Sequence, residues 1–248
     1  MARKPRLVVV LVGLLGLLLT AVVAPTTQAQ PVKFETETHF RCYVISQQTP
    51  EPAKTVTLRD QFMGPQTLTV DEPLEFCAPT SKNGLPILRP EEHLTMYGAA
   101  AGLPEHLTVF TEDQFGARTL EVVGARMLLV PTEKEELGFP KRLNHYWCYQ
   151  AEGPRVSQSV TLDDQFGTDE VRVERPKYFC NPVEKTYAGV TERIVERQVH
   201  LTCYEIFGPQ RTTATTFRAR NQFEQDMFTV TSYDLLCVPS EKKGFQPA

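Results

Sequence analysis

Apolar and polar residues alternate along short segments of this chain, and the segments recur at regular intervals. The alternation is clearest in four of them: Leu68–Val70, Leu120–Val122, Val171–Val173 and Phe228–Val230. Each follows another run rich in Val, Thr, Leu or Phe and precedes a short apolar run. Runs of this kind, separated by Gly, Pro and Asp, are typical of β-strands. Because no helical periodicity extends beyond two turns within these segments, the pattern predicts an all-β fold.

The segments belong to a pattern of about fifty residues that occurs four times. It reads H-x-x-C-Y, then D-Q-F, then C-x-P-x-x-K, and its four copies span residues 35–85, 89–138, 141–189 and 196–244. A fixed period of this size marks a repeat architecture. We therefore predict four tandem small β modules that pack against their neighbours. The alternative is closure like that of a four-bladed β-propeller.

All six cysteines stand at the two cysteine positions of the pattern. The second copy has Met96 and Leu129 there, so both cysteines are missing together, as expected of covalent partners. Six cysteines allow fifteen pairings, and the repetition selects one of them. We predict three disulfides within copies: Cys42–Cys77, Cys148–Cys180 and Cys203–Cys237. The alternatives are zinc bound by His and Cys and free or redox-active thiols. Zinc is disfavoured because His93 persists in the copy without cysteines.

Other residues of the pattern also recur in every copy. They are His39, His93, His145 and His200, then Gln61, Gln114, Gln165 and Gln222, and finally Phe62, Phe115, Phe166 and Phe223. We predict structural roles for all of them. An enzyme ordinarily needs one catalytic constellation, whereas these histidines are present four times.

The residue before each of these glutamines is Asp60, Asp113, Asp164 or Asn221. Asx side chains commonly cap backbone amides in turns, and we predict that role here. Calcium is the alternative, but no D-x-D-x-D-G spacing is present. The lysines that end the pattern, Lys82, Lys134, Lys185 and Lys242, are expected to pair with the Asx side chain or to be solvated.

The only tryptophan, Trp147, lies in the aromatic cluster Tyr146–Tyr149. Trp147 is a candidate ligand contact if it is exposed, and a core residue if it is not. The sequence contains no G-x-S-x-G, H-E-x-x-H, S-x-x-K, P-loop or dinucleotide fingerprint. We therefore expect no catalytic residue, no metal and no cofactor.

The N-terminal residues 1–29 have the pattern of a signal peptide. Arg3, Lys4 and Arg6 precede the apolar run Leu7–Leu19, and Thr27–Ala29 offers a small-residue cleavage site. We expect a secreted protein, extracellular or periplasmic, with no membrane span after cleavage. Retention of the segment as a membrane anchor is the alternative.

The net charge without this leader argues against a nucleic-acid partner. The leader takes three of the 26 basic residues and none of the 30 acidic ones, which leaves a net charge of −7. Binding to nucleic acid requires clustered Lys and Arg. Repeat surfaces typically present extended or multivalent contacts, so the leading hypothesis is a binding or structural role with a protein or surface-glycan partner. A hydrolase or carbohydrate-active enzyme with a site between modules is the alternative.

The combination of H-x-x-C-Y, D-Q-F and C-N-P-x-x-K resembles a domain of unknown function found singly or in tandem in exported prokaryotic proteins. The third copy, with Cys180–Lys185, matches best, and the second departs most because it lacks both cysteines. The resemblance covers most of the chain after the leader. It implies export and repetition, and it implies no activity and no site.

Overall fold

The computed structural model describes residues 33–248 except 50–51, 136 and 211–212. The predicted signal peptide, residues 1–29, lies outside the described residues. Within the described part of the chain, no helix is long and apolar enough to cross a membrane.

The described residues are almost entirely extended, which confirms the all-β class. A short 3-10 helix, η1 (Lys33–Thr36), comes first. The first copy forms β1 (Phe40–Gln47), β2 (Lys54–Arg59), β3 (Gln66–Val70), β4 (Pro73–Pro79) and β5 (Ser81–Lys82). The second forms β6 (His93–Asp113) and β7 (Gly116–Lys134). The third forms β8 (His145–Glu152), β9 (Gln158–Asp164), β10 (Gly167–Tyr187) and β11 (Val190–Glu192). The fourth forms β12 (His200–Phe207), β13 (Thr215–Arg220) and β14 (Gln225–Pro247).

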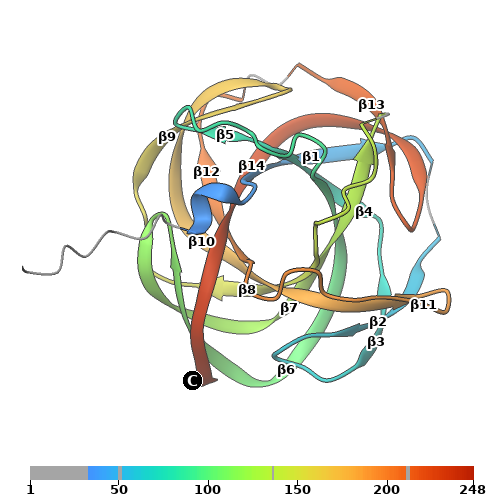
Figure 1. The fold of residues 1–248 in the computed structure, drawn as a ribbon, viewed down its shortest axis with the longest axis vertical. Coiled ribbons are helices and arrows are strands. Elements are labelled where there is room, and N and C mark those ends of the chain that lie inside the picture. Colours follow the sequence, from blue (N-terminus) through green and yellow to red (C-terminus); the bar gives the residue numbers. More distant parts are fainter. Residues whose placement is uncertain (1–32, 50–51, 136, 211–212) are drawn as a thin grey trace, which may run out of the picture. The chain divides into compact units, whose positions relative to one another are not determined.

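Eight of these strands pair, wholly or in part, into a closed ring around a central axis (Figure 1). In each copy, the strand at the first cysteine position pairs antiparallel with the strand at the second cysteine position. It also pairs antiparallel with the strand at the second cysteine position of the preceding copy. The order is β1, β4, β6, β7, β8, β10, β12, β14 and back to β1. The last pairing sets Phe40 opposite Cys237, so the fourth copy joins the first. We call this arrangement the central ring.

A second set of strands lies at the periphery of the ring in Figure 1. Each copy contributes a hairpin: β2 with β3, the ends of β6 and β7 that meet at their turn, β9 with the start of β10, and β13 with the start of β14. The strand that leaves the ring in each copy then pairs with the hairpin two copies further along, in the pairs β5–β9, β7–β13, β10–β2 and β14–β6. The copies therefore contact both their neighbours and the copy opposite, which goes beyond the packing of adjacent modules predicted from the sequence.

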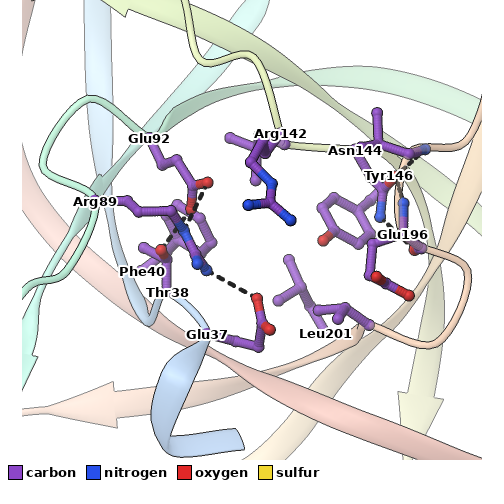
Figure 2. A pocket seen from close by; sticks show the side chains of 13 residues that line it. Glu37, Thr38, Phe40, Arg89, Glu92, Arg142, Asn144, Tyr146, Glu196 and Leu201 are labelled. Atoms are coloured by element: carbon purple, nitrogen blue, oxygen red, sulfur yellow. Dashed lines mark hydrogen bonds and ion pairs between the residues drawn. The ribbon is translucent and has the colours of Figure 1, made fainter.

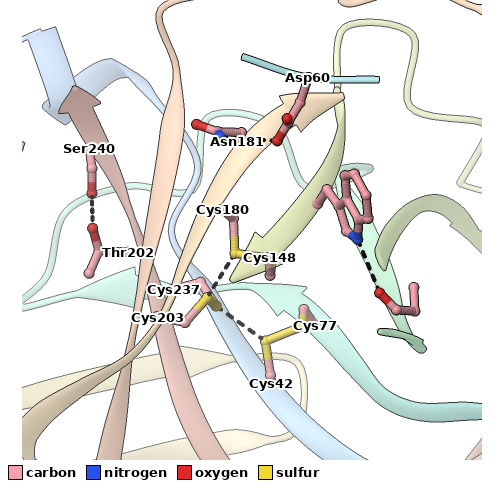
Figure 3. The surroundings of a disulfide bond; sticks show 12 residues. Cys42, Asp60, Cys77, Cys148, Cys180, Asn181, Thr202, Cys203, Cys237 and Ser240 are labelled. Carbon is pink, nitrogen blue, oxygen red and sulfur yellow. Dashed lines mark hydrogen bonds between the residues drawn. A yellow bond between two sulfur atoms is a disulfide. The ribbon is translucent and has the colours of Figure 1, made fainter. Parts of the chain in front are cut away.

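The cysteines fill the middle of the central ring. Side chains alternate between the two faces of a strand. All six cysteines pack in one cluster inside the ring, whereas the tyrosine that follows the first cysteine of each bridged copy packs in the outer clusters. The disulfides are Cys42–Cys77, Cys148–Cys180 and Cys203–Cys237, the pairing that the repetition predicts. Neighbouring bridges touch: Cys42 Sγ lies 3.8 Å from Cys237 Sγ, and Cys180 Sγ lies 3.9 Å from Cys203 Sγ (Figure 3). The second copy completes the layer with Met96 opposite Leu129.

Candidate functional site

The Asx residue of each copy caps the turn that it begins, as the sequence predicts. Asp60 Oδ1 accepts hydrogen bonds from the backbone N–H groups of Phe62 and Met63, both at 2.9 Å. The same bond to the phenylalanine two residues later measures 2.7 Å at Asp113, 2.8 Å at Asp164 and 2.8 Å at Asn221. Asp and Asn are interchangeable in this role, because the cap requires only one acceptor oxygen.

The remaining polar atom of each Asx side chain bonds to a motif tyrosine two copies away. The pairs are Tyr149–Asp60 at 2.8 Å, Tyr204–Asp113 at 2.5 Å, Tyr43–Asp164 at 2.9 Å, and Asn221–Tyr97 at 2.6 Å, where the Asn221 amide donates. The phenylalanine of the same D-Q-F or N-Q-F element packs edge-on against this tyrosine, with ring centroids between 4.8 and 5.2 Å apart. Four equivalent contacts thus join opposite copies across the fold.

The four aligned histidines are buried and uncharged at neutral pH. Burial, more than any other cause, lowers the pKa of His39 and His93 to about 4 and of His200 to about 3, and it lowers that of His145 well below 6.5. His93 also contacts the next copy, where its Nε2 lies 3.0 Å from Gln165 Nε2. An imidazole whose pKa lies this low is neutral near pH 7 and lacks the acidic imidazolium proton that a general acid would donate. The placement supports a structural role rather than acid–base chemistry.

The motif lysines do not pair with the Asx turn of their own copy. Each ammonium group lies over the D-Q-F or N-Q-F phenylalanine of the following copy, a cation–π arrangement. The nitrogen-to-centroid distances are 5.2 Å for Lys82–Phe115, 5.9 Å for Lys134–Phe166, 4.9 Å for Lys185–Phe223 and 4.5 Å for Lys242–Phe62. The recurring lysines therefore also connect the copies.

The structure corrects the suggestion from the sequence that Trp147 contacts a ligand. Its side chain is 0% exposed, and its indole N–H donates to the carbonyl oxygen of Ala99 at 3.1 Å. A ring enclosed on both faces cannot stack on a ligand. Trp147 is a core residue because its strand turns alternate side chains toward the packed peripheral hairpins.

The zinc alternative is contradicted by the disulfides, since all six cysteines are bonded to one another. Across the described ranges, no group of three or more His, Cys, Asp and Glu side chains is placed to hold a metal ion.

Residues that do not belong to the repeated pattern gather in a pocket at one mouth of the central ring (Figure 2). The cavity measures about 90 Å³. Its floor is apolar and comes from the first residues of ring strands and from Leu143, which precedes β8. Its wall is charged or polar and comes from the residues that lead into the motif histidines. The floor residues are Phe40, Leu143, Tyr146 and Leu201, and the polar wall residues are Glu37, Thr38, Arg89, Glu92, Arg142, Asn144 and Glu196.

On one side of this pocket, a single arginine forms ion pairs with two glutamates. Arg89 binds Glu37 and Glu92, each with a nitrogen-to-oxygen distance of 2.8 Å. Arg142 extends toward the middle of the pocket in Figure 2, and it is exposed. It forms no ion pair with any residue in the described part of the chain. The pocket thus presents one guanidinium group without an anionic partner.

The loop that carries Glu196 is fixed by Asn144. Asn144 Oδ1 accepts from the backbone N–H groups of Val195 and Glu196 at 2.8 and 3.0 Å, and its Nδ2 donates to the carbonyl oxygen of Glu196 at 2.7 Å. This connection between the third and fourth copies therefore has a defined position beside Arg142. Sequence reasoning missed the pocket because its polar residues do not recur.

A carboxyl pair that the sequence did not indicate lies toward the other end of the ring strands. Burial, and then the neighbouring Asp234, raise the pKa of Glu75 to about 8, while Lys177 opposes the shift. Lys177 Nζ lies 3.2 Å from Asp234 Oδ2. These residues come from the first, third and fourth copies, so only the closed ring brings them together.

Comparison with known proteins gives one family match. A family model described as a repeat of unknown function (DUF7450) matches residues 93–239, from the motif histidine of the second copy to the motif proline of the fourth. Neither the curated proteins nor the solved structures contain a match.

Proposed function

The chain belongs to this family of repeats of unknown function, and from that premise we propose an exported, non-catalytic protein that binds a partner at the pocket in the mouth of its ring. One observation supports this most strongly. The recurring polar residues are engaged with other copies, whereas the pocket residues do not recur and include Arg142, which forms no ion pair within the described ranges. Three disulfides also favour an oxidising compartment outside the cytoplasm.

The size of the pocket indicates what it accepts. Small-molecule sites usually measure about 300–1,000 Å³, and this cavity is about 90 Å³. It therefore suits a single group projecting from a larger partner. The forked guanidinium of Arg142 can bind a carboxylate through two parallel hydrogen bonds. We infer a protein or surface glycan that inserts a carboxylate, such as an acidic side chain or a uronic acid.

Binding to the surface of the producing cells tests this proposal. The labelled protein without residues 1–29 is added to intact cells, and Arg142→Glu is compared with Lys141→Glu. Lys141 is exposed and does not line the pocket. Both variants replace a cation with an anion, so they change the net charge equally. We expect Arg142→Glu to lose binding and Lys141→Glu to retain it. Equal binding by the two variants would contradict a role for the pocket.

Small carboxylates provide a second readout. Acetate, N-acetylaspartate and glucuronate are titrated into the isotope-labelled protein, and amide chemical shifts are followed by NMR. The expected shifts concentrate at Arg142, Asn144 and the loop around Glu196, and they disappear in Arg142→Glu. Shifts spread evenly over the surface would indicate no site.

Export is tested by the intact mass of the secreted protein. A chain that begins at Gln30, with its six cysteines oxidised, would support signal cleavage and an oxidising destination. A chain that retains residues 1–29 would support the membrane anchor.

The carboxyl pair favours one alternative, a hydrolase with a site between copies. A Glu with a pKa of about 8 holds a proton at neutral pH, and a second carboxyl group beside such an acid is typical of glycoside hydrolysis. Glu75 is, however, only 8% exposed, so substrate has little access to it. Hydrolysis of chromogenic glycosides that disappears in Glu75→Gln would establish this alternative, and no turnover by the native protein would exclude it for those substrates.

A further inference from the structure

Asn181 breaks the repetition at a buried position. It follows the second motif cysteine of the third copy, where the other copies have Ala78, Val130 and Val238. The Asn181 side chain is 0% exposed. A buried amide is costly unless its donors and acceptor are satisfied, so the groups that surround Asn181 are informative.

A carboxyl group and an amine from two other copies contact the two ends of this amide. Asn181 Nδ2 donates to Asp60 Oδ2 at 3.0 Å, as Figure 3 shows. Lys242 Nζ donates to Asn181 Oδ1 at 3.3 Å. The lysine amine therefore lies next to the carbonyl group, and the carboxyl group lies next to the amide nitrogen.

The surroundings of these three groups are aromatic. Lys242 Nζ lies 4.5 Å from the centroid of the Phe62 ring and 4.8 Å from that of Phe245. Tyr149 completes the site by donating a hydrogen bond to Asp60 Oδ2 at 2.8 Å. These rings reduce the access of water to the amine, although Phe245 is itself 43% exposed. Reduced access weakens the hydration that normally keeps an amine and a carboxyl group charged.

The protonation of both groups is shifted toward their neutral forms. Burial lowers the pKa of Lys242 to about 8, although the attraction of Asp60 opposes the change. Burial also raises the pKa of Asp60, against the hydrogen bonds that it accepts. A neutral amine is a nucleophile, and a lysine desolvated in an apolar pocket is a common way to obtain one.

We propose that Lys242 and Asn181 form an intramolecular amide (isopeptide) bond, with Asp60 transferring the protons. This is a covalent modification of the chain itself, and it is independent of the proposed binding function. It would tie the third copy to the last strand of the fourth.

The reaction balances without a cofactor or an oxidant. The Lys242 ammonium first gives a proton to the Asp60 carboxylate, and the free amine then attacks the amide carbon of Asn181. Asp60 passes a proton to the amide nitrogen that it contacts, the bond between carbon and that nitrogen breaks, and ammonia leaves. The new amide nitrogen gives its extra proton to Asp60, which ammonia in turn removes as ammonium. One carbon–nitrogen bond forms and one breaks.

The other copies provide built-in controls. Lys82, Lys134 and Lys185 also lie over a phenylalanine of the next copy, but Val238, Ala78 and Val130 occupy the positions equivalent to Asn181. These positions hold no amide, so no bond forms there.

The sequence also prevents a competing reaction at Asn181. An asparagine can lose ammonia by cyclising onto the backbone nitrogen of the next residue. Asn181 is followed by Pro182, whose nitrogen carries no hydrogen. Loss of ammonia at this side chain therefore reports attack by another amine.

Mass spectrometry of the folded, secreted protein tests the proposal. After full reduction, the intact mass should fall below that of the sequence by one ammonia, and a tryptic digest should contain one branched peptide that joins Asn181 to Lys242. Lys242→Arg should restore the missing mass. Lys134→Arg, the same change at an equivalent position, should leave the deficit in place.

Two further variants protect the test against misfolding. Asn181→Val reproduces the residue of the second and fourth copies and should abolish the bond in a folded protein. Asp60→Asn reproduces the turn residue Asn221 of the fourth copy, so the turn should survive while the bond fails to form. A bond that forms equally well in Asp60→Asn would overturn the role of Asp60.

The proposal would be overturned by a folded native protein whose mass after disulfide reduction equals the mass calculated from its sequence. A deficit of unchanged size in Lys242→Arg would also overturn the proposal. That outcome is the one expected if an N-terminal glutamine at position 30 cyclises, because this reaction releases ammonia too. The branched peptide separates the two sources directly.

Discussion

The second copy of the repeat fills its part of the ring with Met96 and Leu129, whereas the other three copies fill theirs with disulfides. The four pairs nevertheless occupy the same register: Met96 stands opposite Leu129 as Cys42 stands opposite Cys77. Met96 and Leu129 are both 0% exposed. A copy without a bridge keeps the same strand pairing, so the ring is formed by strand pairing and packing. The disulfides add stability to a geometry that does not depend on them.

Among changes to a single copy, removal of its disulfide should have the largest effect on stability. The double change Cys203→Ala and Cys237→Ala makes the fourth copy resemble the second in lacking a bridge. The chain-entropy model gives a loss of about 4 kcal/mol for a loop of this length. We expect a lower denaturation midpoint with retained β-sheet circular dichroism, measured in guanidinium chloride at equal protein concentration. A variant that cannot fold would show that the bridge forms the ring, contrary to the comparison.

Acid should destabilise all four copies alike, because each buries a histidine. The folded pKa of His39 and His93 is about 4, below the ordinary 6.5. The unfolded chain therefore binds more protons between these values, and stability falls as the pH drops from 6.5 toward 4. His39 and His93 each contribute at most roughly 3 kcal/mol, from 1.36 kcal/mol for each pKa unit. Denaturation at a series of pH values measures the slope, and a stability that is flat from pH 7 to 4 would contradict neutral buried imidazoles.

A fourth disulfide in the second copy would sharpen the comparison. Met96→Cys with Leu129→Cys places two cysteines in the register of the natural pairs. We expect the bond to form and to raise stability by about 2 kcal/mol, because a gain of about 4 kcal/mol in chain entropy is offset by lost burial of the larger side chains. Thermal unfolding with and without reductant measures the gain. Two persistent free thiols would show that the second copy differs in backbone geometry.

The contact between opposite copies should have a smaller effect. Tyr149→Phe removes the hydroxyl that donates to Asp60 at 2.8 Å and leaves the edge-on ring contact with Phe62 in place. A hydrogen bond to a charged group contributes about 1.5–3 kcal/mol, and the other donors to Asp60 remain. We therefore expect a loss near the lower end, measured by chemical denaturation. No change in stability would mean that these contacts between copies are incidental.

Sequence reasoning succeeded where the responsible interactions lie within one copy. The alternation of apolar residues predicts the strands, the paired loss at positions 96 and 129 predicts the disulfides, and the Asx residue predicts the turn cap. Each of these signals lies within one copy or recurs at the repeat period, so comparison of the four copies is sufficient to predict these features.

Sequence reasoning could not reach the features that depend on contacts between copies. Tyr149 donates a hydrogen bond to Asp60, which is 89 residues away in the sequence. The repeat period does not indicate which copies face each other. Trp147 is buried by the hairpins of other copies, which the composition of its own strand does not reveal. Arg142 and Asn181 escape prediction for the opposite reason: they do not recur, so the repeated pattern does not mark them. The departures from the pattern are where the pocket and the proposed covalent bond lie.

The central claim is that the four copies close into one ring and unfold together, and Trp147 tests it most directly. Trp147 belongs to the third copy and is the only tryptophan, so its fluorescence reports that copy. The disulfide of the first copy is removed by Cys42→Ala with Cys77→Ala, and denaturation is followed by both fluorescence and far-ultraviolet circular dichroism. The ring predicts a single transition, shifted equally in both signals relative to the native protein. An unshifted tryptophan transition, alongside a separate early loss of β-structure, would show that the copies are independent modules and would contradict the account.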